Sequence, residues 1–407
     1  MRSRDGDTHM SAHLQAGFHI TTPMFIGDAD QKATAIRPTS IKGALRFWWR
    51  ALNWPRFAEA ASDTVAALRA LHAEEARLFG ASATEDEGEQ RGGQGVFLMQ
   101  VQDDTFTKSD KPFEKVDGGL LYLLGMGLAT FKDGGRTLRN ALVSGKDGGR
   151  FTVRLLFKPK TPEADKASVA NAVWAFGLLG ALGSRARHGM GSVSLASWSF
   201  DQREVPKTRQ QYATALTALL GTPANALPPF TALSQGMRLD LSMSASSAEQ
   251  VLRKVGEEQM RYRSFGQNNK VLGQEAERNF GPKNAMHNDH DLVLQATEGV
   301  EPKKVPGRAV FGLPHNYFFS STRGKADINY QFDRKDARRA SPLLLHVHQC
   351  EGEFWAVHCL LPAQFLPEGS KVTIKSKRTF QVSFEPDWRI PVDYLNRFTG
   401  RETVYGR

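Results

Sequence analysis

The chain has 407 residues, too many for one ordinary core and about right for two domains, because domains usually run to ~100–200 residues each. Hydrophobic residues make up 40% and charged residues 24%, a balance that excludes an intrinsically disordered protein. The 53 Lys and Arg outnumber the 43 Asp and Glu, and the net charge of +10 favours a polyanionic partner, nucleic acid first.

The sequence also excludes several functional classes. No stretch approaches the ~20 apolar residues of a membrane-spanning helix, and residues 1–13 are polar, so we expect a cytoplasmic protein without a membrane partner. The two cysteines, Cys350 and Cys359, have neither the spacing of a zinc site nor that of a disulfide framework. We therefore expect buried thiols, with no metal or other cofactor.

Hydrophobic periodicity predicts strands and helices through the first half of the chain. Strands are expected at 13–20, 96–101 and 151–157, and helices at 39–54, 62–79 and 162–179. Thr39 or Ser40 can cap the first helix, and Pro55 is expected to end it. Residues 85–95 are acidic and rich in glycine, which predicts an exposed loop.

The composition turns polar between residues 201 and 234, where four prolines mark a domain boundary. We expect a first domain at 1–205, a linker at 206–234 and a second domain at 235–407. The second domain starts with a strand at 237–243 and a helix at 247–261, the order seen in the first. Further strands are expected at 343–348, 354–361, 372–374 and 380–384. Residues 266–307 lack periodicity, and the whole mixture predicts an α+β fold.

The segment 37–50 carries the strongest local signal. Its cations Lys42, Arg46 and Arg50 stand at i, i+4 and i+8, so a helix lines them along one stripe, with no carboxylate to pair with. Such a stripe can follow successive phosphates, and Ser40 with the free N–H groups of the helix start can bind another phosphate oxygen. The alternative is a solvated face over a core that holds the two tryptophans, and the residues alone favour neither.

A second signal is the glycine-rich segment 177–192, between an apolar helix and a strand. Glycines let a backbone approach a ligand closely, and Arg185, Arg187 and His188 add donors for phosphate or base. The alternative is a helix C-cap followed by a tight turn. The final Lys of a P-loop is missing, which excludes nucleotide hydrolysis at this loop.

These motifs resemble a known family. The runs 22–27 and 37–50 look like the N-terminal signature of RAMP proteins, and the paired tryptophans with flanking arginines are similar to the two-domain RAMP subunits of type III-B CRISPR (Cmr) effector complexes. The run 183–192 resembles the glycine-rich loop of the superfamily. The runs 311–314 and 338–343 look like motifs of the second domain, so the resemblance extends to both halves of the chain.

The resemblance implies tandem ferredoxin-like domains of the RNA-recognition type. It also implies a non-catalytic subunit that contacts the 3′ region of the CRISPR RNA, single-stranded target RNA and other RAMP subunits in antiviral defence. An RNA-guided complex reads sequence by base pairing, so such a subunit needs phosphate contacts and stacking surfaces. The candidate RNA contacts are Lys42, Arg46, Arg50, Arg185 and Arg187, with Ser40, Ile41, Gly183, Ser184 and His188 as additions.

Two other functions stay open at this point. Some RAMP relatives are nucleases that process CRISPR RNA with a histidine as general acid or base, and His188 is the candidate here for a metal-independent enzyme of that kind. A scaffold that only contacts neighbouring subunits is the other possibility.

Three further groups of residues are candidates for binding. The run 287–291 contains His and Asp that could hold a metal, but a solvated polar turn is the better interpretation. His346, His348 and His358 are expected to be partly buried structural histidines. The stretch 302–339 interleaves basic and aromatic residues, which suits stacked single-stranded RNA as well as it suits a surface over an aromatic core.

Overall fold

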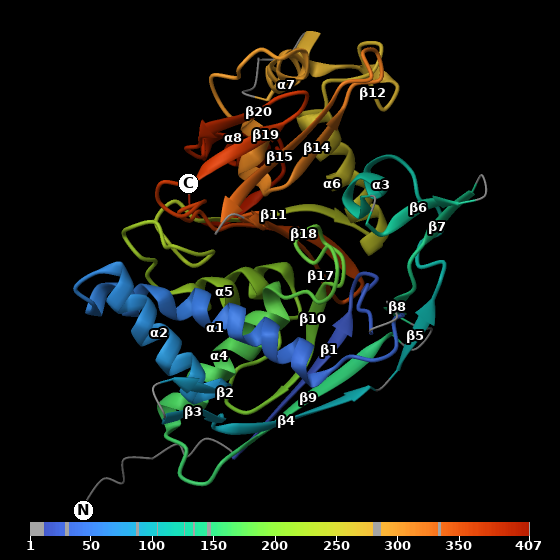
Figure 1. Ribbon diagram of the computed structural model, residues 1–407. Coiled ribbons are helices and arrows are strands. Elements are labelled where there is room, and N and C mark those ends of the chain that lie inside the picture. The colour runs from blue at the N-terminus through green and yellow to red at the C-terminus, as the bar shows by residue number, and fades with distance from the viewer. Residues whose placement is uncertain are drawn as a thin grey trace, which may run out of the picture.

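The computed structural model describes residues 12–28, 32–86, 89–103, 105–125, 127–132, 135–144, 148–279, 286–332 and 335–406. Two four-stranded antiparallel sheets form its frame, and a third sheet, of five strands, caps one end (Figure 1). None of the described helices is long and apolar enough to cross a lipid bilayer.

The first sheet has the strand order of a ferredoxin-like fold. Its strands are β1 (His13–Ile20), β4 (Phe97–Asp103), β9 (Arg150–Phe157) and β10 (Val193–Ser199), hydrogen-bonded in the order β10-β1-β9-β4. Helices α1 (Pro38–Ala60) and α4 (Glu163–Leu179) follow the first and third of these strands and cover one face. This is the β-α-β-β-α-β arrangement with the first and third strands at the centre.

The second sheet repeats the same topology. Its elements are β11 (Arg238–Ala245), α6 (Ala248–Arg263), β17 (Leu343–Cys350), β18 (Glu353–Leu360), α8 (Arg389–Asn396) and β21 (Glu402–Tyr405). The strands pair in the order β17-β18-β11-β21, so again the first and third strands lie at the centre. The prediction of tandem ferredoxin-like domains in an α+β fold is confirmed.

The first unit has several insertions beyond the ferredoxin-like elements. Helix α2 (Thr64–Phe79) packs on α1, and β2 (Gly80–Asp86) with β3 (Glu89–Gln94) forms a hairpin where the sequence predicted an exposed loop. The segment between β4 and β9 holds α3 and two small hairpin-like pairs, whose elements are β5 (Phe106–Ser109), α3 (Gly118–Leu124), β6 (Ala129–Lys132), β7 (Gly135–Leu138) and β8 (Ala141–Ser144).

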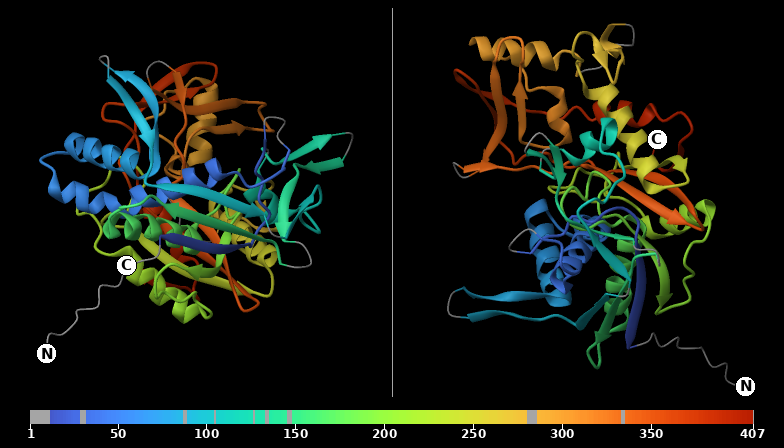
Figure 2. Two further views of the ribbon diagram at one scale, coloured as in Figure 1. Left: turned by 90° about the horizontal axis from the view of Figure 1, so that it is seen from below. Right: turned by 90° about the vertical axis from the view of Figure 1, so that its right-hand side faces the viewer.

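The second unit carries a third layer, in which the strands expected at 372–374 and 380–384 are found and the others were not predicted. Its sheet pairs β14 (His315–Phe318), β15 (Lys325–Phe332), β19 (Lys371–Lys375) and β20 (Thr379–Ser383) in that order, with β16 (Lys335–Ala337) beside β15. The remaining elements are β12 (Lys270–Val271), β13 (Gln274–Glu275), η1 (Glu277–Asn279), α7 (Asp289–Glu298) and η2 (Gly307–Phe311). Figure 2 shows this layer at the end of the molecule away from the first sheet.

One hydrophobic core joins the two sheets. Phe176 of α4 belongs to the same buried cluster as Leu239 of β11 and Trp355 of β18. Helix α5 (Arg209–Leu220), in the segment expected as a linker, belongs to it too, and its buried Tyr212 donates a hydrogen bond of 2.6 Å to Leu178 O. The sequence missed this helix because its flanking prolines and polar residues dominate the composition.

Helix α1 runs past Pro55, so the expectation that this proline ends the helix is wrong. Pro55 has no N–H to donate to Ala51 O, the carbonyl one turn earlier. That carbonyl instead accepts a hydrogen bond of 3.2 Å from the backbone N–H of Leu233, which follows the diproline of the inter-sheet segment. The contact ties residues 228–234 to α1.

The apolar face of α1 is the core that the sequence suggested. Ile41, Leu45, Trp48 and Trp49 are buried, and Trp49 Nε1 donates a hydrogen bond of 2.8 Å to Ser168 Oγ on α4. The opposite stripe of the helix, which carries the cations, remains partly exposed. Each of the two interpretations of this helix, a basic stripe and a tryptophan core, therefore describes one of its faces.

Candidate nucleic-acid interface

The basic stripe of α1 has a carboxylate partner. Arg46 Nε and Arg50 Nη1 each donate a hydrogen bond of 2.6 Å to Glu75 Oε1, whose side chain is 6% exposed on α2. The expectation of a stripe without a carboxylate is wrong, because the partner comes from another helix. One carboxylate balances only one of the two guanidinium charges, and the arginine side chains are still 29% and 34% exposed.

Lys42 lies one turn before Arg46 on the same stripe and is partly exposed. Partial burial, and then the charge of Arg46, lower the pKa of its amine. A cation whose charge is disfavoured by a neighbouring cation gains from a bound anion. Lys42 therefore continues the positive surface of the stripe beyond the two arginines that share Glu75.

The start of α1 differs from its prediction. Arg37 occupies the capping position, so neither Thr39 nor Ser40 caps the helix. The backbone N–H groups of Ser40 and Ile41 are not free, because both donate to Arg37 O, at 3.0 Å and 3.2 Å. The Ile41 side chain is fully buried. The Ser40 hydroxyl is thus the group that these two residues still offer to a ligand.

The glycines of the second motif serve close packing of the backbone. Gly183 has a φ of +88°, and an added Cβ would lie 2.6 Å from Phe25 O. The next residue, Ser184, donates its N–H to that same oxygen at 2.9 Å, and the N–H of Gly191 donates to Pro23 O at 2.9 Å. The loop is therefore held against residues 23–26, as the turn interpretation expects.

Arg185 and His188 point away from the stripe of α1. The side chain of Arg185 lies against Gly125 at the end of α3, and burial followed by the charge of Arg263 lowers its pKa. His188 lines a cavity of about 20 Å³ beside Arg263 and Tyr394, which has room for a single water. Burial, and then the charges of Arg185, Arg263 and Arg187, lower the pKa of His188 to about 3.

Arg187 lines this cavity as well, and it also reaches α1. It donates a hydrogen bond to Ser341 O and lies over the ring of Phe47, with 5.4 Å between its Cζ and the ring centroid. Burial, and then the charge of Arg339, lower its pKa to about 10. Arg339 donates to Gln364 O at 3.2 Å. Among the described residues, no carboxylate forms an ion pair with either arginine.

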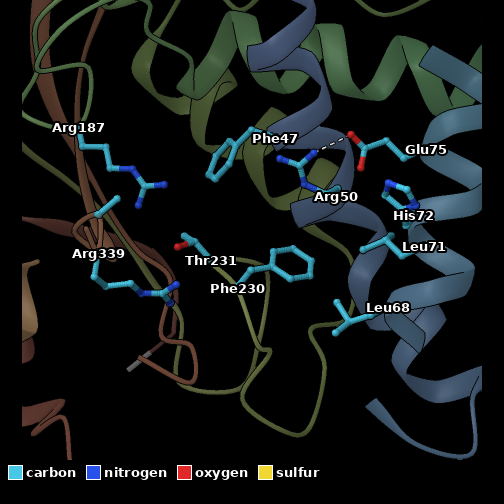
Figure 3. A pocket seen from close by; sticks show the side chains of 11 residues that line it. Phe47, Arg50, Leu68, Leu71, His72, Glu75, Arg187, Phe230, Thr231 and Arg339 are labelled. Carbon is cyan, nitrogen blue, oxygen red and sulfur yellow. Dashed lines mark hydrogen bonds and ion pairs between the residues drawn. The ribbon is translucent and has the colours of Figure 1, made fainter. Parts of the chain in front are cut away.

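These arginines face a pocket of about 320 Å³, which we call the arginine pocket. Figure 3 shows Arg187 and Arg339 on one side of it, and Arg50 bound to Glu75 on the other. Its lining residues are Phe47, Arg50, Leu68, Leu71, His72, Glu75, Arg187, Phe230, Thr231, Arg339 and Ala340. Of the ten predicted contacts, the pocket brings together Arg50 and Arg187, and the other eight do not line it.

Two aromatic rings of the arginine pocket were missed as site residues. Phe47 stands beside the cationic stripe and packs edge-on against Trp48 at 5.1 Å. Phe230 comes from the expected linker and packs edge-on against Trp54 at 5.3 Å. An aromatic residue directly after Pro228 and Pro229 in a polar segment was the available signal for Phe230.

The other histidine groups are structural. Asp289, in the run 287–291, accepts the backbone N–H groups of Gly307 at 2.7 Å and Arg308 at 2.9 Å, and no group of described residues could hold a metal ion. Residues 286–288 form a turn and α7 starts at Asp289, but His287 and Asp289 are buried, so the run is not solvated as expected. His346, His348 and His358 are buried, more completely than predicted. Cys350 and Cys359 are buried free thiols, as expected.

Comparison with known families identifies the first unit. The RAMP superfamily model matches residues 18–194. This match covers the first ferredoxin-like unit and makes that unit similar to RAMP-superfamily domains. Both sequence motifs, the basic helix and the glycine-rich loop, lie inside the matched range, whereas Phe230 and Arg339 lie outside it. No curated protein matches the chain.

Solved structures resemble the chain over nearly its whole length. The crystal structure of Cmr1 from Pyrococcus furiosus, in its apo form, is similar over 97% of this chain and 99% of its own, with 18% identity and a TM-score of 0.52. A cryo-EM structure of the type III-B Cmr-beta complex bound to cognate target RNA is similar over 95% of this chain and 98% of its own chain, with 11% identity and a TM-score of 0.48. At 18% identity, the match to Cmr1 demonstrates a shared fold.

Proposed function

We propose that this chain is a non-catalytic RNA-binding subunit of a type III-B CRISPR effector complex. In this role it holds the 3′ region of the CRISPR RNA and single-stranded target RNA, beside other RAMP subunits in the cytoplasm. The RAMP domain and the fold shared with Cmr1 support membership in such a complex. The proposal also keeps the division into domains at 1–205 and 235–407.

One observation carries the RNA-binding part of the proposal. Three arginines from separate segments, Arg50, Arg187 and Arg339, line one pocket that has a single carboxylate, and Glu75 is already shared with Arg46. A pocket with surplus guanidinium charge attracts phosphate, and RNA offers it along the whole strand. Lys42 and Arg46 extend the positive surface along α1, and Arg185 adds charge on the other side of the glycine-rich loop.

The surroundings of His188 support the absence of catalysis. With a pKa near 3 the imidazole is neutral at pH 7, so it lacks the imidazolium proton of a general acid and is a weak base. Its cavity of about 20 Å³ is too small for a nucleotide. A processing nuclease based on His188 therefore has neither the acid nor the space that the reaction requires.

Incubating the purified protein with CRISPR repeat RNA in EDTA tests the proposal. We expect binding without cleavage, and an affinity that falls steeply with salt because phosphate contacts release counterions. Cleavage that disappears in His188→Ala would instead identify a metal-independent ribonuclease. Absence of any RNA affinity at low salt would leave a scaffold that only contacts neighbouring subunits.

A further inference from the structure

We propose that the arginine pocket holds one unpaired nucleotide of the bound RNA, with its phosphate between Arg187 and Arg339 and its base stacked on Phe230, beside Phe47. The inference rests on the proposed RNA binding and names the unit that this pocket takes. The pocket has two arginines for the phosphate, two aromatic rings for the base and a volume that fits one nucleotide.

The phosphate end is the wall formed by Arg187 and Arg339 (Figure 3). Each guanidinium has five N–H donors, and Arg187 and Arg339 each donate one hydrogen bond to a backbone carbonyl, on Ser341 and on Gln364. Burial, and then the charge of Arg339, lower the pKa of Arg187, and burial lowers that of Arg339. An anion between them removes this repulsion and occupies the remaining donors.

The opposite wall directs the orientation of the ligand. Glu75 lies there with its carboxylate bound to Arg50 and Arg46, so a phosphate on that side would meet a negative charge. The wall with Arg187 and Arg339 has no such carboxylate among the described residues. The charge distribution therefore places the phosphate on the side of Arg187 and leaves the remaining space to the base.

The base meets two supported rings. Phe47 is held by Trp48 and by the guanidinium of Arg187, and Phe230 is held by Trp54. Rings fixed by such neighbours lose little freedom when a base stacks on them. Leu68 and Leu71 of α2 add apolar surface for the sugar and the base edge. A volume of about 320 Å³ lies at the lower end for small-ligand pockets, which suits one nucleotide rather than several.

The test uses full-length protein and a short single-stranded RNA with 2-aminopurine at one position at a time. We expect its fluorescence to be quenched on binding at one or few positions, where the base stacks on a ring. Phe230→Leu should remove the quenching and weaken binding about tenfold, because stacking one base is worth ~1–3 kcal/mol. Phe230→Tyr retains a ring and should retain both signals.

Phe332→Leu is the matched control, since this ring is 60% exposed on β15 and lines no part of the pocket. Circular dichroism melts of all variants verify the fold. Equal RNA affinity and quenching in the wild type and in Phe230→Leu would overturn the nucleotide pocket while RNA binding stands. Absence of RNA binding by the wild type would overturn the proposed function, and this inference with it. Adenosine monophosphate that binds as tightly as the RNA would show a free-nucleotide site instead.

Discussion

Arg187 and Arg339 come from different halves of the chain, face one pocket, and are each anchored by a backbone carbonyl rather than by a carboxylate. Carbonyl anchors fix the position of a guanidinium without cancelling its charge. The two side chains are therefore both held in place and electrostatically unsatisfied. This is the arrangement expected where an anion belongs.

Removal of Arg187 should weaken RNA binding. We expect Arg187→Ala to reduce the affinity for single-stranded RNA about tenfold at low salt, and to reduce the slope of log K against log salt by about 0.7, the contribution of one phosphate contact on a single strand. Fluorescence anisotropy at several salt concentrations measures both quantities.

Arg154→Ala is the control for this experiment. Arg154 lies on β9, exposed on the sheet face away from α1 and α4, and donates to Gln15 Oε1 at 3.0 Å. It removes the same charge from a different surface, so the affinity should change little. A larger loss with Arg154→Ala than with Arg187→Ala would mean that RNA binds the open face of the first sheet.

Glu75→Gln should act in opposite directions on stability and on RNA binding. The substitution leaves Arg46 and Arg50 without their shared carboxylate, so we expect a loss of ~1–3 kcal/mol in the free energy of unfolding. The freed positive charge should raise the affinity for RNA severalfold at low salt. Urea denaturation and anisotropy measure the two effects, and weaker RNA binding by a folded variant would contradict the charge argument.

The buried histidines predict sensitivity to acid. Burial lowers the pKa of His188, His315, His346 and His358 to about 3, from 6.5, and that of His348 well below 6.5. Between pH 6.5 and 3 the unfolded chain binds protons that the folded chain does not, so stability should fall as the pH drops through this window. Urea denaturation at pH 7.5 and at pH 5 measures the loss.

A histidine variant separates this effect from other titrations. His346→Gln can keep the hydrogen bond to Gly180 O, which His346 makes at 3.1 Å, and it removes one titrating group. Its stability should fall less steeply with acid, by up to ~1.4 kcal/mol per pH unit well below pH 6.5. A variant as acid-sensitive as the wild type would show that His346 does not contribute.

Two glycines should respond oppositely to alanine. At Gly183 the φ of +88° and the approach to Phe25 O leave no space for a Cβ, so Gly183→Ala should destabilise the protein by ~2 kcal/mol or more. Gly43 lies exposed in α1 with nothing within 4 Å of an added Cβ, and Gly43→Ala should stabilise the protein by up to ~1 kcal/mol. Thermal melts compare the two, and equal effects would contradict the packing role of Gly183.

Local periodicity predicted much of the frame. The strand expected at 13–20 is β1, and the helix expected at 247–261 is most of α6, because each has a regular apolar pattern that one buried face explains. In the third layer, β19 and β20 were predicted as strands at 372–374 and 380–384, whereas β14, β15 and β16 lie in the stretch 302–339, which was interpreted only as basic and aromatic. The end of α1 was predicted wrongly at Pro55. The helix continues because Leu233 donates to Ala51 O, the carbonyl that Pro55 cannot serve, and no local pattern connects these two residues.

The candidate site was less predictable than the frame. The cations of α1 are visible in the sequence, but Glu75 reaches them from α2 through tertiary packing. Arg187 was predicted from the glycine-rich loop, while its partner Arg339 was visible only as part of a long basic stretch. Phe230 lines the site because the segment 228–234 is hydrogen-bonded to α1. From its composition alone, this segment was predicted to be a linker.

The most direct test of the central claim is a photo-crosslinking map of the protein with single-stranded RNA that contains 4-thiouridine. If RNA binds in the arginine pocket, crosslinks should appear in the peptides that carry Phe47 and Phe230, and they should be lost in a variant that combines Arg187→Ala with Arg339→Ala. Crosslinks confined to the open face of β1, β4 and β9, and unaffected by that double substitution, would contradict it.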